Sequence, residues 1–272
     1  MIDHDPASTE EPELASILER LAFDAWRAAE VESQDGWRLR FNQGVTRRAG
    51  SVWPNEALGH PSLSARIDRA EAFYRQRGEA PLFQVSPAAR PSSLDAALED
   101  RGYSSEAPVT VQIADSALVA AAVEPHRADF ELAETLTESW FSVPNRGGRF
   151  RGADNLVYRS LLRRAGEQPC FALARVDGAP ASVGLGVAQA GWVGVFAMLT
   201  LPEHRGRGLG SLVLGGLAGW AADRGEERLY LQVECDNPTA QRLYQHLGFT
   251  ACYGYHYRRA PRLLHPEGTR PT

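Results

Sequence analysis

Thr200-Leu-Pro-Glu-His-Arg-Gly-Arg-Gly-Leu-Gly-Ser211 is the most specific pattern in the chain, a glycine-rich turn between a predicted strand and a predicted helix. Its glycines at 206, 208 and 210 lack a Cβ, so several backbone N–H groups can point at one spot. The N-terminus of the following helix adds unpaired donors and a positive dipole end, and arginines at 205 and 207 add charge. The segment predicts an anion-binding turn suited to pyrophosphate; a flexible surface turn is the alternative.

Two better-known phosphate-binding turns do not fit this segment. Its glycines miss the GxGxxG spacing, and five residues including Pro202 separate the strand from the turn, whereas a dinucleotide-binding turn follows its strand directly. A Walker A turn needs a lysine, and all 29 basic residues of this chain are arginine. The lack of lysine also excludes Schiff-base catalysis by this chain, because arginine supplies no neutral amine.

The residues around the turn predict alternating helices and strands. Apolar residues recur at helical spacing after Gly208, and Gly225 suits the left-handed position that ends a helix. A strand at 229–233 follows, and then a helix that Asn237 caps and Gly248-Phe249 ends. Ahead of the turn the pattern predicts helices at 128–141 and 155–164 and antiparallel strands at 171–176, 181–188 and 192–199.

A long-period repeat divides the chain. Three dipeptides recur about 147 residues apart: Arg77-Gly78 as Arg224-Gly225, Gln84-Val85 as Gln232-Val233, and Gly102-Tyr103 as Gly248-Phe249. The first copy is shorter, with helices expected at 14–30, 63–77 and 94–101 and strands at 37–41, 45–52, 82–85 and 109–113. The sequence therefore predicts two copies of one α/β (α+β, mixed-sheet) unit.

Length and composition agree with two modest domains. The chain has 272 residues, 43% of them hydrophobic and 23% charged, which is typical of globular proteins. We predict a disordered tail at 1–12, a first lobe at 13–125, a second lobe at 126–259 and a flexible tail at 260–272.

Charge and cysteine content limit the kinds of partner and metal site that we expect. The net charge is −5, and the second lobe with its tail carries 17 arginines against 14 acids, an excess too small for nucleic-acid binding. No apolar run reaches the roughly 18 residues that cross a membrane. Three cysteines form no CxxC and seven histidines no HxxxH, so we expect no metal site and a cytoplasmic location.

Two motifs together resemble a known family. Arg205-x-x-Gly208-x-Gly210 matches the acetyl-CoA signature of the GCN5-related N-acetyltransferases (GNAT), and Asn237-x-x-Ala240-x-x-Leu243-Tyr244-x-x-x-Gly248-Phe249 matches their second signature. The resemblance covers residues 126–258 well and the first half only as an eroded copy. The layout resembles bacterial two-lobed (tandem) members of the family.

The resemblance implies an acetyl-CoA-dependent acyltransferase with assignable residues. Backbone groups of Leu199, Thr200 and Leu201 would pair with the pantetheine arm, and Asn237 would sit near that arm. The pyrophosphate would be held by Arg205, Gly206, Arg207, Gly208, Leu209, Gly210 and Ser211. Tyr244 would protonate the leaving thiolate, because a phenol keeps its proton at neutral pH; its alternative is a packed core aromatic.

The general base is harder to assign. An alkyl amine has a pKa near 10.4, so it must lose a proton before it attacks. Residues 196–201 contain no carboxylate, and Gln232 stands where some protein N-terminal acetyltransferases carry glutamate. Glu234, two residues along the same strand face, is the candidate base; a solvated strand-end carboxylate is its alternative. Three interpretations are open for the loop arginines at 146, 149 and 151: they bind a cofactor phosphate, they bind an anionic acceptor, or they are solvated.

The first lobe lacks both functional parts. Gly59-His-Pro-Ser62 replaces the glycine turn, and Leu98 stands where Tyr244 stands in the second copy. We therefore expect a non-catalytic lobe that shapes the cleft for an amine acceptor, either a small molecule or a protein amine. Two alternatives remain open: a tandem transferase similar to mycothiol synthases, and a non-catalytic acetyl-CoA sensor or interaction module.

Overall fold

The computed structural model describes residues 7–123 and 128–261, here called the first and second halves of the chain. Their eleven strands form one mixed sheet in the order β1-β2-β3-β4-β11-β5-β10-β9-β8-β7-β6, which confirms the predicted α/β fold class. The first half contains α1 (Ala7–Ala25), β1 (Glu30–Gln34), β2 (Trp37–Phe41), the 3₁₀ turn η1 (Arg48–Gly50), β3 (Val52–Trp53), α2 (Leu63–Gln76), β4 (Leu82–Val85), α3 (Leu94–Asp100), β5 (Ser104–Asp115) and α4 (Ser116–Ala121). The second half contains β6 (Asp129–Ala133), α5 (Glu138–Arg146), α6 (Ala153–Arg163), β7 (Pro169–Val176), β8 (Ala179–Gln189), β9 (Trp192–Thr200), η2 (Pro202–His204), α7 (Leu209–Asp223), β10 (Arg228–Glu234), α8 (Pro238–His246) and β11 (Thr250–Arg259).

The repeat seen in the sequence is present as repeated structure. The succession α2–β4–α3–β5 in the first half has the same order as α7–β10–α8–β11 in the second. Each of these four helices ends in a Schellman motif around a glycine of positive φ. The Tyr103 N–H donates to the Leu98 carbonyl at 3.0 Å, and the Phe249 N–H donates to the Tyr244 carbonyl at 3.0 Å. Leu98 and Tyr244 therefore occupy equivalent positions.

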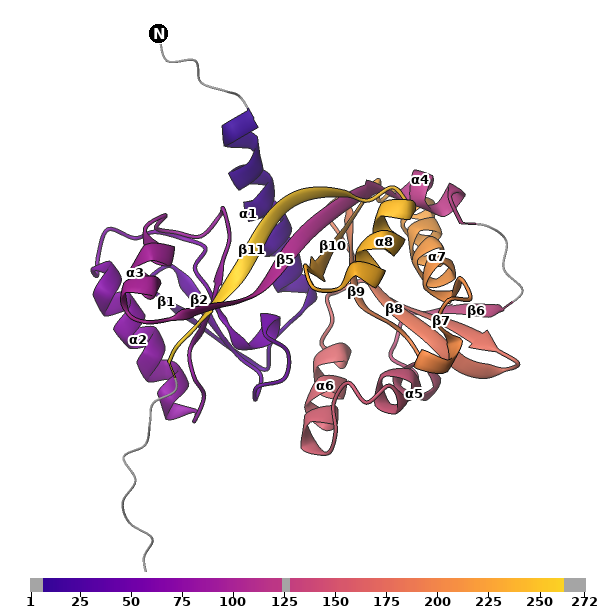
Figure 1. Cartoon of the computed structure of the whole chain (residues 1–272), viewed down its shortest axis with the longest axis horizontal. Coiled ribbons are helices and arrows are strands. Elements are labelled where there is room, and N and C mark those ends of the chain that lie inside the picture. Colours follow the sequence, from indigo (N-terminus) through magenta and orange to yellow (C-terminus); the bar gives the residue numbers. More distant parts are fainter. Residues whose placement is uncertain (1–6, 124–127, 262–272) are drawn as a thin grey trace, which may run out of the picture.

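The last strand of each half is inserted between strands of the other half. Strand β11 lies between β4 and β5, and β5 lies between β11 and β10, so the two long strands cross the middle of the molecule together (Figure 1). Strand β5 pairs antiparallel with β10 from Val109 to Asp115 and with β11 from Ser104 to Ile113. The sheet is therefore continuous from one half to the other.

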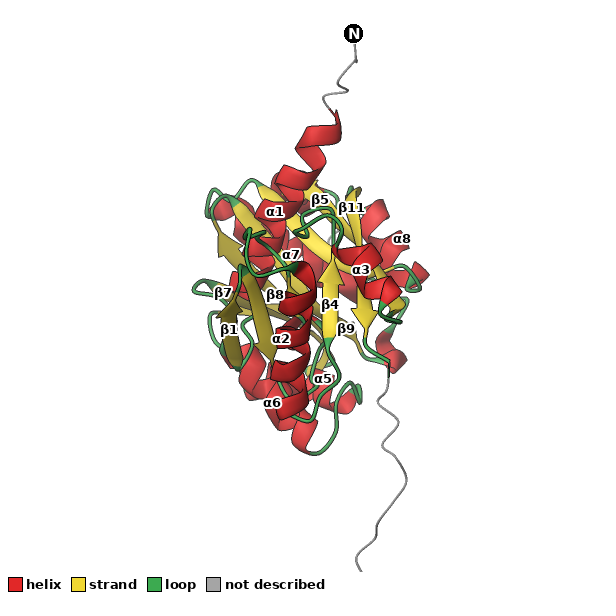
Figure 2. Ribbon diagram, turned by 90° about the vertical axis from the view of Figure 1, so that its left-hand side faces the viewer, coloured by secondary structure: helices red, strands yellow, loops and turns green. Residues whose placement is uncertain are grey.

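Three clusters of buried side chains hold helices against this sheet, which has helices on both sides (Figure 2). One packs α2 and α3 in the first half, and one packs α7 and α8 in the second. The third joins both halves, because it combines α1 with α5, α6 and the middle of the sheet. Trp26 of the first half stacks on Phe196 of the second, with ring centroids 5.5 Å apart. Burial of apolar surface therefore fixes the two halves to each other.

Most predicted elements are present, with differences at four places. Helix α1 begins at Ala7, within the tail predicted to be disordered, and residues 1–6 lie outside the described part. The predicted strand at 45–52 is wrong: it is a turn and η1, with β3 only from Val52 to Trp53. The Asn42 side chain donates to the Val45 carbonyl at 3.0 Å, and Thr46 has φ +66°, so the backbone turns instead of extending.

The predicted helix at 128–141 is also wrong in its first part. Residues 129–133 form strand β6, and helix α5 starts only after Thr137, whose side chain accepts from the Trp140 N–H at 3.1 Å. Phe130 of β6 packs against Gly216 of α7, which decides in favour of a strand that covers this helix. Strand β1 and helix α4 had no prediction. The predicted boundary at 125/126 lies outside the described residues, as does the predicted tail at 260–272 except for its first two residues.

Among the helices of residues 7–123 and 128–261, none combines the length and the apolar character that crossing a membrane requires.

Candidate active site

The site is made where two parallel strands separate. Strands β9 and β10 pair only from Trp192 and Arg228 to Val195 and Leu231. Just beyond this point the register of β9 against β8 shifts, and Ala197 takes φ +51°. This left-handed conformation is uncommon for a residue with a side chain and marks a bulge. The bulge bends β9 away from β10, so the edge of β9 faces a gap.

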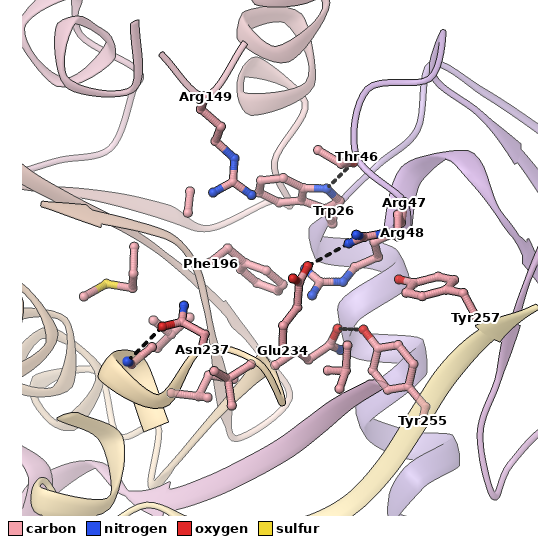
Figure 3. Close-up of a pocket in the computed structure, with 18 of the residues that line it drawn as sticks. Trp26, Thr46, Arg47, Arg48, Arg149, Phe196, Glu234, Asn237, Tyr255 and Tyr257 are labelled. Carbon is pink, nitrogen blue, oxygen red and sulfur yellow. Dashed lines mark hydrogen bonds and ion pairs between the residues drawn. The ribbon is translucent and has the colours of Figure 1, made fainter. Parts of the chain in front are cut away.

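A cavity of about 560 Å³ opens at this gap and is lined by both halves of the chain (Figure 3). The second half contributes residues of β9, β10, α8 and β11 and the loop before α6. The first half contributes Trp26, which directly follows α1, the turn at 44–48 and Val109 of β5. The polar and aromatic residues around the cavity are Trp26, Thr46, Arg47, Arg48, Arg149, Phe150, Phe196, Gln232, Glu234, Asn237, Tyr244, Tyr255 and Tyr257. Sequence reasoning did not find Thr46, Arg47 and Arg48, because the turn that carries them was predicted as a strand.

Backbone groups of β9 alternate between the neighbouring strand and the gap. The Leu201 N–H donates to the Ala181 carbonyl at 3.0 Å, and the Leu201 carbonyl accepts from the His204 N–H at 2.9 Å. Since alternate residues of an antiparallel strand bond to the same neighbour, Leu199 and Leu201 face β8, whereas Met198 and Thr200 face away from it. On that side the Thr200 carbonyl accepts from Arg205 Nε at 3.3 Å. The pairing of Leu199, Thr200 and Leu201 with the pantetheine arm stays a prediction; Met198 shares the orientation of Thr200.

The glycine turn has the predicted form. Gly206 has φ +72°, and Gly208, with φ +77°, is the residue before the first turn of α7. No side chain caps this helix, so its first N–H groups remain directed at the outside. Arg205, Gly206, Arg207 and Gly208 are exposed, Gly210 and Ser211 are partly buried, and Leu209 anchors the helix in the core. The turn thus has the donors that an anionic group needs.

The equivalent helix of the first half begins differently. Ser62 caps α2 and accepts from the Ala65 N–H at 3.4 Å. At the start of α2 a side-chain oxygen therefore accepts from a backbone N–H group, whereas the corresponding N–H groups of α7 have no side-chain cap. The expectation that the first half is non-catalytic stays a prediction.

Asn237 and Tyr244 come from the helix beside the gap. The Asn237 Oδ1 accepts from the Ala240 N–H at 3.1 Å and so caps α8 as predicted. Tyr244 is 7% exposed, lies against Phe249 with ring centroids 5.8 Å apart, and lines the cavity. Burial raises the pKa of Tyr244 to about 12. The phenol therefore stays protonated at neutral pH and can donate a proton.

Glu234 is held by a residue of the first half. Arg47 Nη1 donates to Glu234 Oε1 at 2.7 Å (Figure 3). Arg47 Nε lies 3.6 Å from Glu106. The Glu234 side chain is 46% exposed, so the carboxylate remains in contact with water. On the same strand face, Gln232 accepts from the Tyr255 hydroxyl at 2.8 Å. Glu234 is the single carboxylate among the described residues that line the cavity.

The three arginines of the loop, Arg146, Arg149 and Arg151, lie in different surroundings. Arg146 pairs with Glu203 at 3.1 Å and donates to the Pro180 carbonyl at 3.2 Å. Arg151 is exposed, and only Arg149 of the three lines the cavity.

Comparison with known proteins gives one family. The family described as "Probable histone acetyltransferase Rv0428c C-terminal" matches residues 15–258. The chain is 29% identical over 244 residues to the uncharacterized N-acetyltransferase YobR of Bacillus subtilis, covering 89% of this chain and 96% of that protein. It is 28% identical over 233 residues to the probable histone acetyltransferase Rv0428c of Mycobacterium tuberculosis, covering 85% of this chain and 69% of that protein.

Solved structures share the fold at low sequence identity. A GCN5-related N-acetyltransferase from Kribbella flavida superposes with a TM-score of 0.68 at 16% identity, covering 91% of this chain and 96% of that one. A tandem GNAT protein from the clavulanic acid biosynthesis pathway gives a TM-score of 0.59 at 17% identity, covering 74% and 70%. Because the family match spans nearly all of the described residues, the chain belongs to the Rv0428c C-terminal family of GCN5-related N-acetyltransferases and is an acyltransferase.

Proposed function

We propose that the protein transfers an acetyl group from acetyl-CoA to a primary amine by direct attack inside the cavity between β9 and β10. One observation carries this proposal: the edge of β9 that faces the gap leads from the uncapped N-terminus of α7 to the cavity that Tyr244 lines. The start of α7, the edge of β9 and the cavity lined by Tyr244 therefore follow one another in space.

Acetyl-CoA would lie along the edge of β9 in an extended form. Its pyrophosphate would bind the turn from Arg205 to Ser211, where backbone donors and the helix dipole favour a negative charge. Its pantetheine amides would pair with Met198 and Thr200 as an added strand, with Asn237 beside the arm. The thioester would then reach the cavity near Tyr244.

The chemistry needs one proton to leave the amine and one to reach the sulfur. The neutral amine attacks the thioester carbonyl, a C–N bond forms, and the C–S bond breaks as the tetrahedral intermediate collapses. Tyr244 gives its proton to the departing thiolate, and the amine proton passes to Glu234, directly or through water. Arg47 engages Oε1 of Glu234, so Oε2 is the oxygen available to that water.

The test is release of coenzyme A from acetyl-CoA by the purified protein over a panel of amines. Tyr244→Phe should lower turnover by about 100-fold or more and leave acetyl-CoA affinity within about twofold, because only the proton donor is lost. Tyr103→Phe is the matched control, since Tyr103 is an equally buried phenol of the first half that bonds Glu71 at 3.0 Å, away from the cavity.

Unchanged turnover in Tyr244→Phe would remove the acid role of this tyrosine. Binding of acetyl-CoA without transfer to any amine would instead favour the sensor interpretation. We also keep the cytoplasmic location as a prediction, which rests on the three free thiols Cys170, Cys235 and Cys252.

A further inference from the structure

Arg48 is a cation inside the cavity without an acidic partner. Its Nε is buried and has no hydrogen-bond partner, and its Cζ lies 5.4 Å from the centroid of the Phe196 ring. Burial disfavours the charged guanidinium, but the neighbouring hydroxyls of Tyr255, Tyr257 and Tyr230 favour it more strongly, so the pKa of Arg48 is raised. None of the carboxylates in the described residues forms an ion pair with it. A permanent positive charge is therefore held at the wall of the cavity.

The other charges of the cavity do not neutralise Arg48. Glu234 is its single acidic residue in the described part of the chain, and Arg47 already binds that carboxylate at 2.7 Å. Arg149 lines the same cavity (Figure 3). Its Cζ lies 5.8 Å from the ring centroids of both Phe150 and Tyr158. Arg47 is also paired with Glu106, and both Arg47 and Arg149 are exposed, so Arg48 is the cavity arginine with a buried, unpartnered donor; buried charges are normally paired.

We propose that the acceptor is a small amine that also carries an anionic group, a carboxylate or a phosphate, which binds Arg48 while its amine lies toward Glu234. This inference rests on the proposed acetyl transfer and names the substrate class of the same site. The guanidinium supplies a planar fork of donors that matches either oxyanion. The Tyr257 hydroxyl can add a donor, because burial raises the pKa of Tyr257 well above its usual value.

The same charges disfavour strongly basic acceptors. A polyamine or a lysine-rich peptide would bring further positive charge toward Arg48 and Arg149, and repulsion between like charges is strong in a partly enclosed cavity. The volume of about 560 Å³ must also admit the thioester end of the donor. That leaves space for a small molecule.

The first test compares acceptors that share an amine and differ only in the anionic group. Suitable sets are phenylalanine with phenethylamine, and β-alanine and phosphoethanolamine with ethanolamine; spermidine and a lysine-rich peptide are the basic contrast. In the wild-type protein, the anionic member of at least one set should be used with a kcat/KM roughly 10-fold to 100-fold higher. The β-alanine and phosphoethanolamine arms distinguish carboxylate from phosphate.

The second test removes the charge from Arg48. Arg48→Met should abolish this preference mainly through a higher KM, because the anion is bound equally in the ground and transition states. Arg48→Lys keeps a charge without the planar fork and should retain part of the preference. Arg69→Met is the matched control, since Arg69 is an exposed arginine whose partner is Asp35 at 2.8 Å in the first half.

A binding measurement makes the result independent of turnover and of folding in any one variant. In the presence of coenzyme A, calorimetry on the wild-type protein should show tighter binding of N-acetylphenylalanine or N-acetyl-phosphoethanolamine than of N-acetylphenethylamine or N-acetylethanolamine. Equal or better use of the uncharged partners, together with equal binding of these products, would overturn the inference and leave acetyl transfer standing. No binding of acetyl-CoA would instead contradict the proposed function.

Discussion

Arg47 donates a hydrogen bond to Glu234 at 2.7 Å, although the two residues are 187 positions apart in the chain. The contact joins the turn after β2 to the end of β10, and both residues line the same cavity. A half of the chain that lacks the glycine turn and the tyrosine thus supplies part of the cavity in which we propose that the acceptor binds. This relationship gives the first half a role beyond packing.

The pairing predicts coupling between Arg47 and Glu234 in catalysis. Glu234→Gln should lower kcat by about 100-fold or more if Glu234 is the base. Arg47→Met should have a smaller effect alone and little further effect in the Glu234→Gln background, because its influence acts through that carboxylate. Stability should change by no more than about 1 kcal/mol, since both side chains are well exposed. Initial rates of the four proteins check this, and additive losses would contradict it.

Tyr244 predicts a specific loss of stability at alkaline pH. Burial raises its folded-state pKa from 10.0 to about 12, so the unfolded chain loses this proton at a lower pH than the folded protein. The contribution of the protonated Tyr244 phenol to the free energy of unfolding is complete below pH 10 and is lost as the pH rises through 12. At pH 11 the ionisation of Tyr244 should cost about 1.4 kcal/mol of unfolding free energy. Urea unfolding at pH 8 and pH 11 measures this, and Tyr244→Phe should lose less stability over that interval than the wild type.

Alanine substitutions at two glycines with the same φ angle distinguish an effect on acetyl-CoA binding from an effect of backbone strain on stability. Gly208 and Gly178 both have φ +77°, one at the start of α7 and one in the β7–β8 hairpin. An alanine at either position should cost about 1–2 kcal/mol of stability. Only Gly208→Ala should also raise the Kd for acetyl-CoA, because a Cβ at this turn blocks the approach of the pyrophosphate. Calorimetric titration of both variants decides this, and equal affinities would contradict the assigned cradle.

The shared sheet predicts that the second half does not fold alone. Strand β11 pairs only with β4 and β5, both from the first half, and β10 would lose its β5 partner. A fragment of residues 128–261 should therefore be unfolded or aggregated, with hydrogen-bonding edges exposed. Co-expression with residues 7–123 should restore a folded complex. Circular dichroism and size-exclusion chromatography measure both outcomes, and a monomeric, folded and active fragment would contradict this account.

Local signals predicted the elements around the glycine turn well. Helix α8 has its Asn237 cap and its Gly248 stop where expected, because capping depends on a few adjacent residues. The predicted strand at 45–52 was wrong for the opposite reason. The Asn42 side chain that closes its turn is a local signal, but the turn also depends on packing against the second half, which no local pattern encodes.

The sequence by itself determined the motifs: the glycine turn, the capped helix with Tyr244 and the internal repeat, all of which depend on spacing along one segment. The tertiary structure decided which residues meet. It exchanged β5 and β11 between the halves, bent β9 at Ala197, and brought Arg47 and Arg48 to the cavity of Glu234. The physical reason is that strand pairing and burial act between residues far apart in the chain, and alternative pairings differ only through the packing of the whole sheet.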